Sequence, residues 1–112
     1  MNIFIICSVR GASKEYVDRL TKYIEHLELR HSVHLPHRDT NQDASGLGIC
    51  CQNRQAIQDC DEVHIFYNPD SQGTHFDMGM AFAMHKRIKV IESVPFDEGK
   101  SFPRILEEWE RR

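Results

Sequence analysis

The stretch that decides the fold is residues 63–83, VHIFYNPDSQGTHFDMGMAFA. It opens with a short apolar run, passes through a turn that contains Pro69 and Gly73, and continues as a helical pattern. Apolar β-formers predict a strand over residues 62–67, and the residues after the turn predict a helix over 74–85. A strand that feeds a helix through a short turn is the repeating unit of α/β proteins.

The same unit recurs along the rest of the chain. We predict further strands over residues 2–7, 32–35 and 88–92, with helices over 14–30, 49–60 and 103–112. The polar stretch 37–48, HRDTNQDASGLG, predicts a loop. This alternation predicts an α/β three-layer sandwich, flavodoxin-like or Rossmann-like, with a parallel sheet of four to five strands in the order 2-1-3-4.

The composition limits the possible classes of protein. A chain of 112 residues fits one domain, 1–112, and a formal net charge of −3 gives no general reason to bind a nucleic acid polymer or an anionic membrane. The N-terminal residues lack the basic start of a signal peptide, and no apolar run approaches the roughly 20 residues of a membrane span. The four cysteines include the adjacent pair Cys50 and Cys51 and match no standard zinc spacing. We therefore expect a cytoplasmic protein with reduced thiols, no metal and no cofactor.

In parallel α/β folds, ligands bind beyond the carboxyl ends of the strands. The loops predicted at those ends cover residues 8–12, 36–48, 68–73 and 93–100, and every unusual polar stretch of the chain lies in one of them. This agreement points to a ligand site at that edge of the sheet.

The first of these loops has the features of an anion site. Ser8, Val9, Arg10 and Gly11 lie between a strand and a helix, where free backbone amides and the helix dipole attract negative charge. A serine hydroxyl and an arginine side chain add donors suited to phosphate. The alternative is an ordinary turn with a surface arginine. The loop matches neither a P-loop nor a dinucleotide fingerprint.

The second loop repeats the arrangement and leads to an acid. Residues 70–74, DSQGT, place a turn and Gly73 at a helix start, and Asp77 follows within the first turns. An acid there stabilises a helix by a few tenths to about 1 kcal/mol, so a purely structural role is one alternative. Because its neighbours Phe76 and Met78 are apolar, Asp77 is also a candidate nucleophile or acid–base group. Gly79 predicts a close approach of another backbone.

The two motifs together resemble those of the nucleoside 2-deoxyribosyltransferase superfamily, and within it most closely those of the 2′-deoxynucleoside 5′-monophosphate N-hydrolases. CSVRGA, residues 7–12, resembles the family's G-S-I-R-G-G loop, and SQGTHFDMGMA, residues 71–81, resembles its S-x-G-x-x-x-E-x-G-x-A motif. The similarity covers roughly residues 2–92. It implies cleavage of an N-glycosidic bond in a nucleoside or nucleotide, or the related transfer of deoxyribose between bases.

The resemblance also implies roles for individual residues. Asp77 occupies the place of the family's nucleophilic glutamate and is one methylene shorter. Asn53, eight residues before Asp61, stands where the family has an aspartate, and an amide cannot act as an acid or base. The resemblance assigns to the pocket for the 5′-phosphate and sugar Ser8, Val9, Arg10, Gly11, Ser71 and Gly73.

Four other residues are candidates without a motif behind them. His37, Arg38 and Asp39 could read the base or supply acid–base chemistry, although a solvated loop is the alternative for each. His75 lies on the first predicted helical turn, where it could face either the site or solvent. The superfamily implies a homodimer or larger homo-oligomer. Two other functions remain open: a non-catalytic nucleotide-binding or sensor module, and a generic flavodoxin-like regulatory domain that would leave the second motif unexplained.

Overall fold

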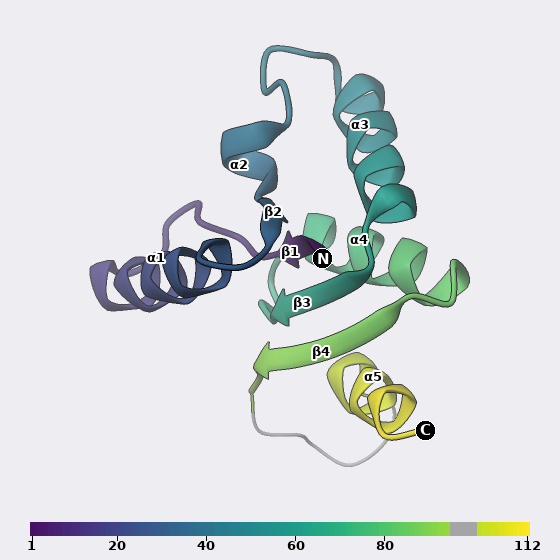
Figure 1. Cartoon of the computed structure of the whole chain (residues 1–112). Coiled ribbons are helices and arrows are strands. Elements are labelled where there is room, and N and C mark those ends of the chain that lie inside the picture. The colour runs from purple at the N-terminus through teal and green to yellow at the C-terminus, as the bar shows by residue number, and fades with distance from the viewer. Residues whose placement is uncertain (95–100) are drawn as a thin grey trace.

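The computed structural model describes residues 1–94 and 101–112, and it contains one parallel sheet (Figure 1). Within these residues the sheet has four strands in the order β2-β1-β3-β4, as predicted. The strands are β1 (Asn2–Ile6), β2 (Ser32–His34), β3 (Glu62–Phe66) and β4 (Arg87–Glu92). The helices are α1 (Lys14–Glu28), α2 (Pro36–Asp39), α3 (Gly46–Asp59), α4 (Gln72–Ala83) and α5 (Phe102–Glu110).

The two central strands are buried on both faces, which explains their nearly continuous apolar sequences. Side chains alternate between the faces. Ile3 and Ile5 of β1 therefore pack with Leu20 and Ile24 of α1 on one face. On the other face, residues from the remaining three long helices cover the sheet. They include Ile57 of α3, Met78 and Ala81 of α4, and Leu106 of α5.

Most predicted elements are present, with shifts of one to three residues at their ends. Helix α1 has a side-chain N-cap, because the Ser13 side chain accepts a hydrogen bond from the backbone amide of Tyr16. The helix predicted to reach residue 85 ends at Ala83, because His85 adopts a left-handed conformation with φ 58°. The predicted loop at 93–100 lies largely in residues 95–100, outside the described part of the chain.

The prediction of one loop over residues 37–48 is wrong. Pro36 begins the short helix α2, and α3 begins at Gly46, two residues before the predicted loop would end. Proline favours the first helical position because its fixed φ suits a helix and its missing amide needs no partner there. The Asp39 carboxylate accepts a hydrogen bond from the Leu35 amide at 2.9 Å, which closes the turn.

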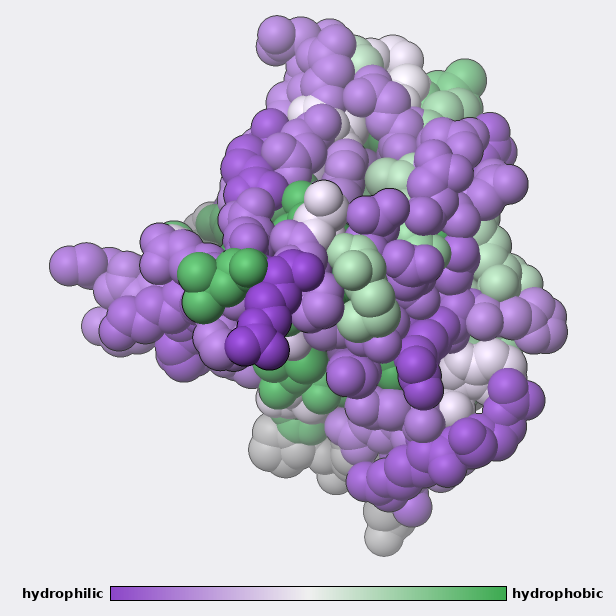
Figure 2. Space-filling view, in the orientation of Figure 1, coloured by the Kyte–Doolittle hydropathy of each residue, from purple (hydrophilic) through white to green (hydrophobic). Residues whose placement is uncertain are grey.

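All four cysteines are free in the structure. Among the described residues, no helix is both long and apolar enough to cross a bilayer. The face of the molecule shown in Figure 2 is mainly hydrophilic, with small, separate hydrophobic areas.

Candidate active site

The two predicted anion loops emerge side by side from the sheet. Strands β1 and β3 are neighbours, and Ile6 pairs with Ile65 near their carboxyl ends. Each loop leads into a helix that a serine caps: Ser13 caps α1 and Ser71 caps α4. Two helix N-termini, with their partial positive charge, therefore start at the same edge of the sheet.

The first loop leaves a cation available for a ligand. Gly11 has φ +69°, a conformation that glycine adopts without strain, and the Ala12 amide donates to the Val9 carbonyl at 3.2 Å. Arg10 is exposed and makes no hydrogen bond or ion pair with any residue that the structure describes. Ser8, two residues before Arg10, is partly buried. The loop can therefore offer a guanidinium to an anion without breaking an existing interaction.

The second loop is held by its own hydrogen bonds. The side chain of Asn68 accepts a hydrogen bond from the Asp70 amide at 2.9 Å, and the Ser71 hydroxyl accepts one from the Thr74 amide at 3.1 Å. The Ser71 hydroxyl keeps its own proton to donate. A Cβ at Gly73 would lie 3.9 Å from Ser71 Oγ, an ordinary contact, so packing alone does not demand glycine there.

Asp77 is partly buried, and burial raises the pKa of its carboxyl group to about 6. It acts in turn on Cys7 at the end of β1, whose thiol pKa is raised to about 12 by burial and by the Asp77 charge. Helix α4, which follows β3, and the loop that follows β1 therefore meet at Asp77 and Cys7. A partly buried carboxylate with a raised pKa is a candidate for chemistry, and a pKa of about 6 leaves Asp77 mostly ionised at neutral pH.

His75 is held by both of its ring nitrogens. Nδ1 donates to the Ser71 carbonyl at 2.7 Å, and Nε2 therefore accepts from the Tyr67 hydroxyl at 2.8 Å. The ring also contacts Phe102 edge-on, with ring centroids 5.9 Å apart. These bonds tie the end of β3 to the first turn of α4, so His75 braces the second loop.

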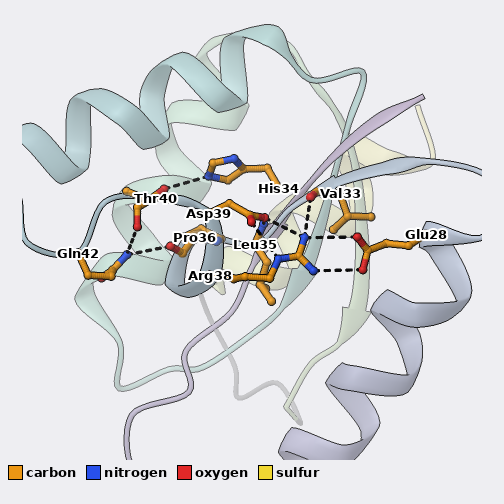
Figure 3. Close-up of polar contacts among 9 residues, drawn as sticks. All are labelled: Glu28, Val33, His34, Leu35, Pro36, Arg38, Asp39, Thr40 and Gln42. Carbon is orange, nitrogen blue, oxygen red and sulfur yellow. Dashed lines mark hydrogen bonds and ion pairs between the residues drawn. The ribbon is translucent and has the colours of Figure 1, made fainter.

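Asn53 belongs to a buried chain of hydrogen bonds on the α3 side of the sheet. The Thr40 hydroxyl donates to Asn53 Oδ1 at 2.7 Å, and Thr40 therefore accepts from His34 Nε2 at 2.9 Å (Figure 3 shows the Thr40–His34 contact). Asn53 Nδ2 makes no hydrogen bond with the described residues, and no hydrogen bond among them joins Asn53 to Asp77. The amide nitrogen is the part of Asn53 that remains available to a ligand.

Arg38 and Asp39 lie together on α2 in a second network (Figure 3). The Arg38 guanidinium donates to Asp39, to Glu28 of α1 at 3.1 Å and to the Val33 carbonyl at 3.0 Å. The neighbouring His37 is exposed, and its pKa is lowered by partial burial and by the Arg38 charge. The geometry thus gives Arg38 and Asp39 a structural task that the sequence did not indicate.

The structure also brings forward two residues that the sequence analysis missed. Tyr16 on α1 and Thr74 on α4 have buried hydroxyl oxygens without a hydrogen-bond partner among the described residues. Each lies three residues after the serine that caps its helix, but no signal in the sequence shows that its hydroxyl lacks a partner.

Two cavities border these elements. An apolar one of about 320 Å³ lies between α4 and α5, and His75, Gly79, Phe82 and Ile105 are among its lining residues. A Cβ built on Gly79 meets no described atom within 4 Å, so the predicted close backbone approach is wrong, and the missing side chain instead enlarges this cavity. The second, of about 470 Å³, lies between β2 and α3 and includes Ser32 and Gln55. Within the described residues, no group of three or more His, Cys, Asp or Glu side chains could hold a metal ion.

Fold and loops together define an α/β protein whose ligand edge is built from two capped helix starts. The chain belongs to the nucleoside 2-deoxyribosyltransferase family, since the family model matches residues 6–101. The resemblance to this family that was inferred from the two motifs is thereby confirmed.

Solved structures show the same fold. The CMP N-glycosidase BcmB of Clostridium botulinum is 24% identical with a TM-score of 0.72, and the match covers 96% of this chain and 81% of that one. The 2-deoxyribosyltransferase of Bacillus psychrosaccharolyticus is 13% identical with a TM-score of 0.67, covering 95% and 90%. The enzyme of the same class from Leishmania mexicana is 17% identical with a TM-score of 0.63, covering 83% and 65%. A comparison with curated protein sequences finds no significant match.

Proposed function

We propose that this protein cleaves the N-glycosidic bond of a nucleoside or deoxynucleoside 5′-monophosphate, with Asp77 as the nucleophile. The observation that carries the proposal is a partly buried carboxyl group on α4 with a pKa of about 6, close enough to Cys7 at the end of β1 to raise the pKa of that thiol. The relative named as a CMP N-glycosidase supports a nucleotide substrate.

In this reaction Asp77 attacks the anomeric carbon as the bond to the base breaks, and the base leaves with the bonding electron pair and takes up a proton. Water then hydrolyses the glycosyl–enzyme ester, which releases the sugar phosphate and the free carboxylate. The alternative acceptor is a second base, which would give deoxyribosyl transfer. A nucleophile must be ionised, and a pKa of about 6 meets this condition at neutral pH.

We assign the remaining groups by their chemistry. Arg10 and the amides of the first loop bind the 5′-phosphate together with Ser8 and Gly11, because the guanidinium there has no other partner among the described residues. The Ser71 hydroxyl and the backbone at Gly73 bind the sugar. Asn53 Nδ2 donates to a sugar hydroxyl. The exposed His37 is the member of the α2 segment best placed to meet the base, because Arg38 and Asp39 already bind each other.

A second candidate function is a nucleotide-binding or sensor module without turnover. Two observations favour it: the acid at position 77 is the shorter aspartate, and Asn53 replaces a carboxylate and already accepts a hydrogen bond from Thr40. Such a module would keep the two anion-binding loops but would not cleave the N-glycosidic bond.

The two candidates differ in whether free base appears. We expect the protein, incubated with a panel of ribo- and deoxyribonucleoside 5′-monophosphates, to release base that chromatography detects, and a second free base in the mixture tests for transfer. Asp77→Ala should abolish the release of base, because the two motifs, residues 7–12 and 71–81, contain no other carboxylate. Asp77→Glu should retain or raise the rate of release. Asp18→Ala, which removes an exposed acid on α1, is the matched control and should leave the rate unchanged.

Saturable binding of the nucleotides without any base release would refute the enzyme and support the binding module. Undiminished release by the alanine variant would refute Asp77 as the nucleophile.

A further inference from the structure

We propose that the hydroxyl groups of Tyr16 and Thr74 hydrogen-bond the sugar-phosphate part of the substrate, one from each side of Asp77. This inference rests on the proposed function and adds two residues: Tyr16 lies outside both motifs, and Thr74 stands at a variable position of the second motif.

Both hydroxyls are buried and lack a partner. The side-chain oxygens of Tyr16 and Thr74 are inaccessible to solvent, and neither makes a hydrogen bond with any described residue. Thr74 as a whole is only 2% exposed. A buried hydroxyl left without a partner costs on the order of 1–3 kcal/mol, so folded proteins keep few of them.

The two residues occupy equivalent places on the two helices that border the site. Tyr16 donates its backbone amide to the Ser13 cap at 3.1 Å, and Thr74 donates its amide to the Ser71 cap at 3.1 Å. Each side chain therefore belongs to the first turn of its helix, where backbone amides already favour an anionic or oxygen-rich ligand.

Both residues are also close to the candidate nucleophile and its neighbours. Thr74 lies three residues before Asp77 in α4, so the two share one face of the helix. The Tyr16 ring packs edge-on against Phe66, the last residue of β3, with centroids 6.3 Å apart. The Ser8 backbone lies within reach of the Tyr16 hydroxyl and acts to lower its pKa, against the larger effect of burial, but the contact lacks the geometry of a full hydrogen bond. The two orphan hydroxyls therefore flank the point where the two loops meet.

A sugar phosphate supplies what these groups lack. A hydroxyl can donate one hydrogen bond and accept others, and sugar hydroxyls and phosphate oxygens offer complementary partners. The ligand would then satisfy in the complex two groups that remain unsatisfied in the free protein. A hydroxyl that served only packing would gain nothing from the nucleotide.

Tyr16→Phe and Thr74→Val remove the hydroxyls with little change of shape and separate these two explanations. We expect each variant to melt at the same or a higher temperature than the wild type, because an unsatisfied buried group is gone. We expect the dissociation constant for the best-bound nucleoside monophosphate, measured by calorimetry, to rise on the order of 5- to 10-fold. Thr74→Ser, which restores a hydroxyl, should bind more tightly than Thr74→Val.

The matched controls are Tyr23→Phe and Thr21→Val. The Tyr23 hydroxyl contacts His64 at 2.6 Å, so its loss should lower the melting temperature while nucleotide affinity stays the same, and Thr21 is exposed on α1. Unchanged affinity in both Tyr16→Phe and Thr74→Val, with a wild type that binds nucleotide, would overturn the inference and leave the proposed function standing. A wild type that binds none of the nucleotides would overturn both.

Discussion

At the scale of single residues, Asp77 works against the stability of the fold. Burial raises its pKa from 3.8 to about 6, so the ionised form that the reaction needs is the form that the folded protein holds less favourably. A group placed for chemistry often carries such a cost. The raised pKa therefore links the proposed activity to a measurable property of the free protein.

We predict that Asp77→Asn stabilises the protein at pH 7 by about 1–2 kcal/mol, because an amide is neutral and similar in shape to the protonated acid. The full shift would correspond to nearly 3 kcal/mol, and partial exposure of the side chain reduces that figure. Urea unfolding at several pH values measures the difference.

The direction of the pH dependence follows from the raised pKa. In the unfolded chain Asp77 titrates near 3.8 and in the folded protein near 6, so the folded state binds more protons between these values. The stability that Asp77 contributes is complete below about pH 4 and is lost as the pH rises through 6. The gap between wild type and Asp77→Asn should therefore be small at pH 4 and widest above pH 7. A gap that stays constant across this range would contradict the assignment of the raised pKa to Asp77.

At the scale of elements, the sequence predicts the sheet and its long helices well because their signals are local. Apolar runs mark β1 and β3. Ser13 marks the start of α1, and its side chain accepts a hydrogen bond from the backbone amide three residues later. The positions of the two anion loops follow from the strand order. The unpaired hydroxyls of Tyr16 and Thr74 cannot be predicted in this way, because sequence alone cannot show which polar groups lack hydrogen-bond partners.

Helix α2 escaped prediction for a related reason. Its four residues are too few to show helical periodicity, and its stability depends on Arg38 reaching Glu28, ten residues earlier in the chain (Figure 3). That contact becomes visible only when α1, β2 and α2 are folded together. Arg38 thus joins α1, β2 and α2, and it is not the freely solvated loop residue that was one alternative from the sequence.

We predict that Arg38→Ala lowers the free energy of unfolding by about 1 kcal/mol, because it removes a partly exposed ion pair together with the hydrogen bond to the Val33 carbonyl. Hydrogen exchange should become faster for the amides of residues 38–40, whose bonds close α2. Arg30→Ala is the control, since the Arg30 side chain is exposed and has no hydrogen bond or ion pair with the described residues. Equal effects of the two substitutions would show that α2 does not depend on the network.

At the scale of the whole molecule, the exposed aromatic side chains are unevenly distributed. Phe76 and Phe82 of α4 are 56% and 43% exposed, and Phe102 of α5 is 50% exposed. Phe82 and Phe102 also line the apolar cavity between these helices. The face in Figure 2 is by contrast mainly hydrophilic. Clustered exposed apolar side chains mark surfaces that bind other proteins.

We propose that α4 and α5 form the contact between subunits of a homodimer or larger homo-oligomer, and we predict that Phe82→Glu dissociates it. A charge at the centre of an apolar contact must be desolvated without a partner, which costs several kcal/mol. Light scattering coupled to size-exclusion chromatography should give a multiple of 13.1 kDa for the wild type and a single subunit for Phe82→Glu. Leu29→Glu, which alters an exposed residue just after α1, should leave the assembly intact.

Since α4 also carries Asp77, the monomeric variant should lose activity along with assembly if the neighbouring subunit supports this helix. A monomeric wild type would refute the proposed contact, and an intact oligomer of Phe82→Glu would place the interface elsewhere on the surface.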